Sequence, residues 1–141
     1  MPHEAMSQYL RQVESAIRKS ENAYVEHYEE EILTPGRVNL RIRLRFMSGH
    51  LLELNEASVS EEGDITHPGY RYHFQDKDDK LIFRYDNTPH FPKIGTFPHH
   101  KHLKENVLPS VKPSIFMVIR EAVSLSQSDS ERRTDIKNFQ G

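Results

Sequence analysis

The residues with the most chemical potential in this 141-residue chain lie in one short stretch. Residues 84–102 read RYDNTPHFPKIGTFPHHKH and contain four of the chain's nine histidines and three prolines. Histidine titrates near neutral pH, so it can accept and return a proton, and neutral imidazole is also a metal ligand. Proline restricts the backbone and can hold a neighbouring side chain in place at low entropic cost. The stretch predicts acid and base chemistry, a metal site or an anion site.

Three roles compete for these histidines. In the first, they act as acid and base in RNA cleavage through the ribose 2′-OH, and no cofactor is expected. The residues in this role are His90, His99, His100 and His102. In the second, they hold a divalent metal together with Asp86, although the spacing H-H-x-H matches no regular zinc motif. In the third, they only hydrogen-bond loop carbonyls or face solvent.

The third, structural role is the expectation for the histidines outside any cluster. These are His3, His27, His50 and His67. Among the other residues, we expect Arg43, Arg84 and Lys101 to hold phosphate. Asp86 is expected to orient a histidine, or to ligate the ion if a metal is bound.

Apolar periodicity predicts the elements that position this stretch. Residues 5–17 carry apolar side chains at helical spacing, and KPSIFMVIREAVSLS predicts a second helix near the C-terminus. Between them, strands are predicted at YVEHYEEEIL, RVNLRIRLRFM, LLELNEASVS, YRYHFQD and LIFRYD. Short turns between successive strands favour antiparallel pairing. We therefore expect an α+β fold, with an antiparallel meander of about five strands and an N-terminal and a C-terminal helix packed on one face.

Strand alternation also predicts which polar residues share the second face of this sheet. Tyr70, Tyr72 and Phe74 are expected in the core. The polar residues grouped on the opposite face are Arg41, Arg43, Arg45, Glu53 with Asn55 or the alternate residues of that strand, Arg71, His73, Arg84 and Asp86. Such a face could receive a phosphate backbone, or it could be a solvated surface of salt bridges.

Composition limits the classes of function. The 19 Lys and Arg against 21 Asp and Glu give a net charge of −2, so a site for a polyanion must be local. The absence of cysteine excludes disulfides, thiolate ligands and a thiol nucleophile. No apolar run approaches the ~20 residues of a membrane span, and the N-terminus does not resemble a signal peptide. We expect a cytoplasmic protein without a membrane partner.

The length fits one domain, expected over residues 1–125. Residues 126–141 are polar, almost without apolar periodicity, and predict a flexible C-terminal tail. An exposed edge of the sheet could pair with another chain, so homo-oligomerisation is left open.

Two motifs resemble a known family. FRYDNTPHFPKIGTFPHHKH is similar to the TumE-type toxins of prokaryotic toxin–antitoxin modules, which show R-[YW]-D-N-x-P-H-H followed by F-P-H-H-K-H. The second motif is complete, whereas Phe91 stands where the first has its second histidine. The resemblance covers most of the chain and fades in the tail. It implies a toxin of ribonuclease type, with RNA as substrate, that is neutralised by a cognate antitoxin protein.

The leading hypothesis is therefore an endoribonuclease toxin that uses the histidine-rich stretch and the arginine-bearing sheet face. One alternative is a non-enzymatic binding module whose arginines and histidines grip an acidic partner. Another is a metal-dependent phosphodiesterase, which would lose activity in a chelator.

Overall fold

One seven-stranded antiparallel sheet and two helices make up the fold in a computed structural model, which describes residues 2–89 and 93–140. Side chains are described as far as residue 127. In chain order the elements are α1 (Glu4–Arg18), β1 (Ala23–Thr34), β2 (Arg37–Phe46), β3 (Leu51–Glu61), β4 (Asp64–Gln75), β5 (Leu81–Asp86), β6 (His100–His102), β7 (Val107–Pro109) and α2 (Ile115–Gln140).

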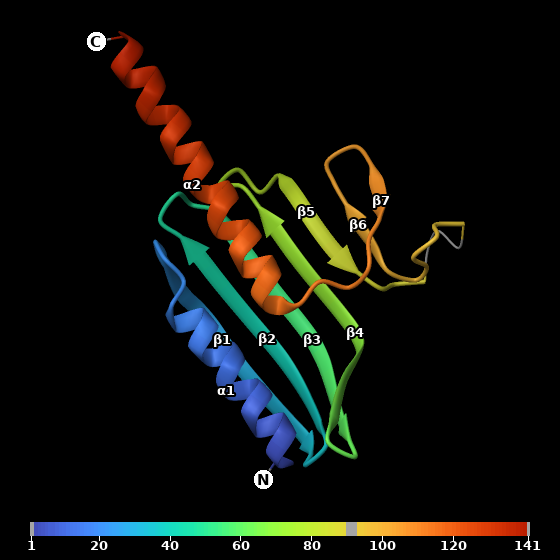
Figure 1. Cartoon of the computed structure of the whole chain (residues 1–141). Helices are drawn as coiled ribbons and strands as arrows, with labels where there is room; N and C mark the ends of the chain where they lie inside the picture. Colours follow the sequence, from blue (N-terminus) through green and yellow to red (C-terminus); the bar gives the residue numbers. More distant parts are fainter. Residues whose placement is uncertain (1, 90–92, 141) are drawn as a thin grey trace.

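The sheet is a meander, because each strand pairs with the next one in the chain, from β1 to β7. Both helices lie on the same face of the sheet (Figure 1), which confirms the predicted α+β arrangement. The first five strands are the expected ones. The other two, β6 and β7, have three residues each and come from the histidine-rich stretch and the segment after it. His100–His102 forms a strand rather than a loop because it pairs with β5 and continues the sheet.

The turn between β3 and β4 fixes the register of the sheet's centre. Glu62 and Gly63 have φ angles of 51° and 84°, the positive values that a two-residue type I′ hairpin requires. Glycine adopts such an angle without steric cost, whereas a non-glycine residue does so less readily. β4 consequently begins at Asp64, several residues before the predicted strand YRYHFQD.

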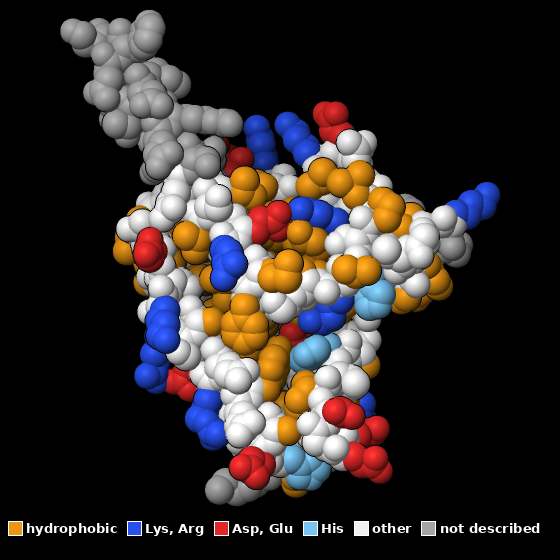
Figure 2. Space-filling model, in the orientation of Figure 1, with side chains coloured by type: hydrophobic (Ala, Val, Ile, Leu, Met, Phe, Trp, Pro, Cys, Tyr) orange, Lys and Arg blue, Asp and Glu red, His pale blue; other side chains and the backbone are white. Residues whose placement is uncertain are grey.

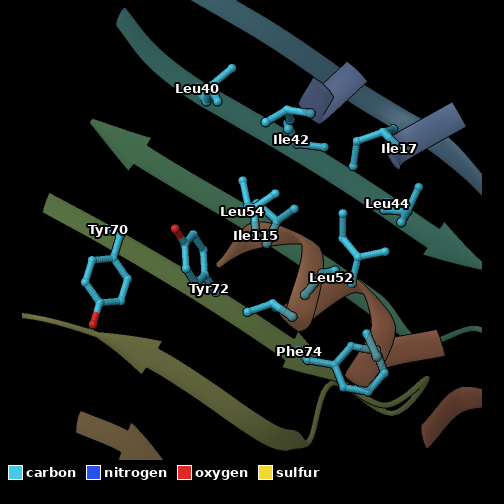
Figure 3. Packing of buried hydrophobic residues seen from close by; sticks show 14 of the residues in the cluster. Ile17, Leu40, Ile42, Leu44, Leu52, Leu54, Tyr70, Tyr72, Phe74 and Ile115 are labelled. Atoms are coloured by element: carbon cyan, nitrogen blue, oxygen red, sulfur yellow. The ribbon is translucent and has the colours of Figure 1, made fainter. Parts of the chain in front are cut away.

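The core lies between the helices and the sheet. The even-numbered residues of β2 that face it are at most 2% exposed: Val38, Leu40, Ile42, Leu44 and Phe46. In Figure 3, Leu52 and Leu54 lie near Ile115 of α2, whereas Ile42 and Leu44 lie near Ile17 of α1. Truncating a buried leucine to alanine costs about 2–5 kcal/mol, so such contacts fix the helices on this face. The predicted burial of Tyr70, Tyr72 and Phe74 is confirmed.

The predicted tail falls mostly on residues whose side chains lie outside the described part of the chain. The backbone of α2 continues to Gln140. The division into a domain over residues 1–125 and a flexible tail over residues 126–141 stays a prediction.

Candidate functional site

The sheet face opposite the helices, called here the open face, carries the arginines of β2. Along this strand the even positions are buried, and the odd positions Arg37, Asn39, Arg41, Arg43 and Arg45 point to the open face. The open face of β2 therefore holds four arginines and no carboxylate. A local positive surface is compatible with a net charge of −2 for the whole chain.

Strand register aligns the polar residues of the open face in two neighbouring rows. The first row runs through Arg41, Asn55, Arg71, Asp86 and His100. The second runs through Arg43, Glu53, His73, Arg84 and His102. Paired positions on one face lie within reach of each other's side chains. The open face thus brings residues from five strands, far apart in sequence, into one surface.

At the β5–β6 end of these rows four side chains form what we call the acid–histidine cluster: Arg84, Asp86, His100 and His102. Asp86 Oδ1 lies 2.7 Å from His100 Nε2, and Asp86 Oδ2 accepts a hydrogen bond from Arg84 Nε at 3.2 Å. The same Oδ2 lies 3.6 Å from His102 Nε2. The rings of His100 and His102 meet edge to face, with centroids 4.6 Å apart. One carboxylate is therefore shared by three nitrogen-bearing side chains.

The two histidines of the cluster differ in their exposure to solvent and therefore in whether they can contact a ligand. His100 is 1% exposed, and its Nδ1 lies 2.8 Å from the carbonyl oxygen of Pro98. A carbonyl oxygen only accepts, so His100 Nδ1 carries a proton and Nε2 is the atom that faces Asp86. The side chain of His102 keeps 16% exposure. His102 can therefore reach a ligand, whereas His100 holds the carboxylate in place.

His73 lies in the second row, between Glu53 and Arg84. Burial lowers the pKa of its imidazole, against the hydrogen bond that it shares with Gln75. Its Nε2 lies 2.9 Å from Gln75 Oε1. A lowered pKa favours the neutral ring at pH 7, so His73 adds no positive charge to the open face.

The structure separates the predicted site residues instead of gathering them all. His99 lies on the helix-covered side, where its Nδ1 is 2.8 Å from the hydroxyl oxygen of Tyr70 and the two rings stack. Lys101 also lies there, because successive strand residues alternate faces, and it forms an ion pair with Glu121 at 2.9 Å. His90 lies outside the described residues. The role of each stays a prediction.

Arg43, a predicted phosphate-binding residue, is on the open face but already paired. Its Nε donates to Glu26 at 2.9 Å, and its Nη1 lies 3.5 Å from Glu53. Hydrogen bonds from Arg45 and Arg43 lower the pKa of the Glu26 carboxyl. A phosphate would have to compete with two carboxylates for Arg43.

A second group of titratable residues, the Glu56 cluster, lies under α1 on the helix-covered face. Glu56 accepts hydrogen bonds from the hydroxyls of Tyr9, Tyr72 and Ser58, and its Oε1 lies 3.1 Å from His67 Nδ1. Histidine and charged side chains reach the surface beside α1, over β3 and β4 (Figure 2). Sequence reasoning missed this cluster. The available signal was a carboxylate at an even position of β3, in line with Leu52 and Leu54.

The Glu56 carboxyl stays ionised despite its burial. Burial alone would raise its pKa, but the hydrogen bond and the positive charge of His67, with the hydroxyls of Tyr72 and Tyr9, lower it to about 2. Burial and the nearby carboxylate raise the pKa of both tyrosines. The cluster is thus a hydrogen-bonded carboxylate whose donors come from α1, β3 and β4.

Fold and site together define a small α+β protein with an acid–histidine cluster at one end of an arginine-bearing sheet face. The family model described as Toxin TumE matches residues 13–129 of the chain. The chain therefore belongs to the TumE toxin family, as its two histidine motifs indicated. No significant match was found among curated proteins or among solved structures.

Family membership has two consequences. It makes the chain a toxin component of a toxin–antitoxin system, and it implies a cognate antitoxin as partner. Among the residues that the structure describes, no helix is both long enough and apolar enough to cross a membrane.

Proposed function

We propose that this TumE-family toxin is an endoribonuclease whose active site is the acid–histidine cluster. The observation that carries the proposal is the position of Asp86, held between His100 at 2.7 Å and Arg84 at 3.2 Å, with the partly exposed His102 beside it. A titratable ring, a fixed carboxylate and a cation at one edge of an open sheet face are the groups that phosphodiester cleavage needs.

In the proposed reaction the ribose 2′-OH gives its proton to a base, the 2′-oxygen forms a bond to phosphorus, and the bond from phosphorus to the 5′-oxygen breaks. The leaving 5′-oxygen takes a proton from an acid, which leaves a cyclic phosphate and a 5′-OH. His102 acts as one of these two proton-transfer groups, since histidine titrates near neutral pH. His90 stays the predicted candidate for the other.

The remaining residues of the cluster have supporting roles. Arg84 faces the charge that develops on the phosphoryl oxygens. Asp86 and the buried His100 are positioning residues that hold Arg84 and His102 in one arrangement. His99 and Lys101, on the helix-covered side, are less favoured for contact with the reacting phosphate than the sequence alone suggested.

A second candidate is metal-dependent phosphodiester hydrolysis, which one observation favours. The donor atoms of Asp86, His100 and His102 all lie within 4.8 Å of one another. His100 donates its Nδ1 proton to a backbone carbonyl, the arrangement that orients the other ring nitrogen toward a metal. These three residues would then be the ligands, and the ion would supply a Lewis acid and an activated water.

The test is cleavage of labelled total RNA by purified protein with and without EDTA, with His102→Gln beside the wild type. The matched control is His27→Gln, which changes an exposed histidine on β1. Cleavage that survives EDTA and falls about 100-fold in the His102 variant alone supports acid and base catalysis. Loss in EDTA, with recovery on adding one divalent ion, supports the metal-dependent reaction. No cleavage by the wild type in either condition would contradict both.

A further inference from the structure

The open face contains a depression beside the acid–histidine cluster, over β2, β3 and β4. It has a volume of about 520 Å³, within the range of small-ligand sites. The residues that line it on the open face are Asn39, Arg41, Asn55, Ala57, Gly69 and Arg71. Ala57 and Gly69 are opposite each other in the β3–β4 register, so the methyl group of Ala57 and the backbone of Gly69 form its floor.

Two arginines at the rim of the depression form no ion pair among the described residues, although Glu29 is opposite Arg41 and Asp86 is opposite Arg71 in the strand register. Arg41 and Arg71 are exposed, and within the described part of the chain their guanidinium groups make no hydrogen bond or ion pair. Arg43, two residues from Arg41, contrasts with them because Glu26 and Glu53 hold it. A free guanidinium presents its planar fork of donors to a phosphate without first giving up a carboxylate.

Asn55 lies in the first row, between Arg41 and Arg71, and Asn39 lies in the adjacent row with Ala57 and Gly69. An amide side chain offers both a donor and an acceptor, as the edges of nucleobases and the ribose hydroxyl require. Phosphate and base partners are therefore available at the same place. A base reaches a hollow in a sheet face only when it is not stacked in a duplex, so this chemistry fits a single strand.

The register connects the depression to the cluster. Arg71 is opposite Asp86 in the β4–β5 ladder, and Arg41 lies in the same row three strands from Asp86, which corresponds to about 14 Å. Arg71 and Arg41 would therefore contact phosphates next to the scissile one and further along.

We propose that the depression bounded by Arg41, Asn55 and Arg71 is a nucleotide subsite for single-stranded RNA that extends from the acid–histidine cluster across the open face. RNA as the ligand rests on the proposed function. Binding and cleavage are measured separately below, so that failure of one is distinguishable from failure of the other.

The probe is a fluorescently labelled single-stranded ribo-oligonucleotide of about 12 residues with 2′-O-methyl groups, in EDTA. The methyl groups remove the 2′-OH nucleophile, and EDTA removes divalent ions, so binding is observed without cleavage. Fluorescence anisotropy at several KCl concentrations gives Kd and its salt dependence. For Arg41→Gln/Arg71→Gln we expect Kd to rise about tenfold or more, and the slope of log Kd against log salt to fall by about 1.4, the loss of two phosphate contacts.

The matched control is Arg11→Gln/Lys19→Gln, which removes the same charge from an exposed position of α1 and from its exposed C-cap residue, on the other side of the sheet. Its Kd should stay within about twofold of wild type. The control changes the net charge as much as the arginine pair does, but it removes no contact on the open face. Equal weakening in the control, or no weakening in the arginine pair, would overturn the proposal. So would failure of the wild type to bind the probe.

A second variant series leaves the charge unchanged. A Cβ added at Gly69 meets no atom within 4 Å, so Gly69→Ala and Gly69→Leu can fold while filling the depression to different extents. We expect Gly69→Leu to weaken probe binding severalfold and Gly69→Ala to weaken it less. Unchanged binding by the leucine variant, with a wild-type circular dichroism spectrum, would contradict a base in the depression.

Cleavage of unmodified RNA completes the comparison. If the wild type binds the probe through Arg41 and Arg71 but cleaves no RNA, the subsite is supported and the proposed function fails. If cleavage depends on His102 while the arginine pair and the Gly69 variants bind normally, the proposed function is supported and the subsite is overturned.

Discussion

Two carboxylates on opposite sides of one sheet, Asp86 and Glu56, have similar burial and different partners. Asp86 is 4% exposed and Glu56 is 3% exposed, and each has a histidine nitrogen within 3.1 Å. Three hydroxyls donate to Glu56, from α1, β3 and β4. The neighbours of Asp86 are instead an arginine and two histidines of β5 and β6.

The difference shows how the same residue types can serve stability in one place and chemistry in another. Hydroxyl donors from three elements satisfy Glu56 and tie a helix to the sheet, so its removal should affect folding. The ion pairs of Asp86 lie within two adjacent strands, and His102 keeps some exposure. The acid–histidine cluster can therefore exchange contacts with a ligand while the core stays intact.

The largest effect is expected for Glu56→Ala. The hydroxyls of Tyr9, Tyr72 and Ser58, together with His67, would lose their shared acceptor. Breaking a buried network of this kind should lower the free energy of unfolding by about 4 kcal/mol, measured by urea denaturation. A loss of unfolding free energy below about 1 kcal/mol would contradict a stabilising role for the Glu56 cluster.

The free energy of unfolding should depend on pH through protonation of the Glu56 carboxyl. Its pKa is lowered in the folded protein from 4.5 to about 2, so the folded state favours the ionised form. The stabilisation, about 3 kcal/mol, is present above pH 4.5 and is lost as the pH falls toward 2. Urea midpoints across this window should decline in the wild type and decline less in Glu56→Gln. Parallel curves for the two proteins would contradict this assignment.

Asp86→Asn should show the opposite behaviour to Glu56→Ala. The amide keeps the shape of the side chain but loses the charge that holds Arg84 and His102. RNA cleavage should fall about 100-fold, or about 2.7 kcal/mol in activation free energy, while the free energy of unfolding changes by about 1 kcal/mol. Retained cleavage in a destabilised variant would reverse the roles of the two carboxylates.

Tyr9→Phe tests the link between α1 and the sheet. It removes one hydroxyl that donates to the buried Glu56, which should cost about 1.5 kcal/mol of unfolding free energy. The control is Tyr28→Phe, whose hydroxyl donates at 3.0 Å to Glu30 in a more exposed position and should cost less. Equal losses in the two variants would show that the Glu56 cluster adds nothing beyond an ordinary hydrogen bond.

The smallest effect is expected for Arg43→Gln. Because Arg43 is exposed and already paired with Glu26 and Glu53, it should contribute little to stability and less than Arg71 to RNA binding. RNA cleavage should stay within about twofold of wild type. If Arg43→Gln weakened RNA binding more than Arg71→Gln does, the phosphate contacts would have to be assigned to the second row, which contains Arg43.

Much of the fold could be predicted from local pattern. The alternation in RVNLRIRLRF assigned each residue of β2 to a face, and YRYHFQD did the same for the second half of β4. A strand has a period of two, so such patterns report burial directly. The missed elements, β6 and β7, have three residues each, too few for a periodicity to be visible.

The site was predicted in part. Density of histidines identified residues 84–102, and Asp86, His100 and His102 do meet there. Density could not show that His99 and Lys101 would lie on the other side, because that depends on pairing with β5. The Glu56 cluster draws on residues 9, 56, 58, 67 and 72, and no local pattern connects positions so far apart.

The sequence by itself determined the α+β class, the family, the histidine-rich stretch and which residues of the long strands face the core. Each of these depends on residues that are close together along the chain. Only the tertiary structure decided which histidines share a carboxylate and which arginines are left unpaired. Those outcomes depend on register between strands, and register is set by turns and by packing of the whole core.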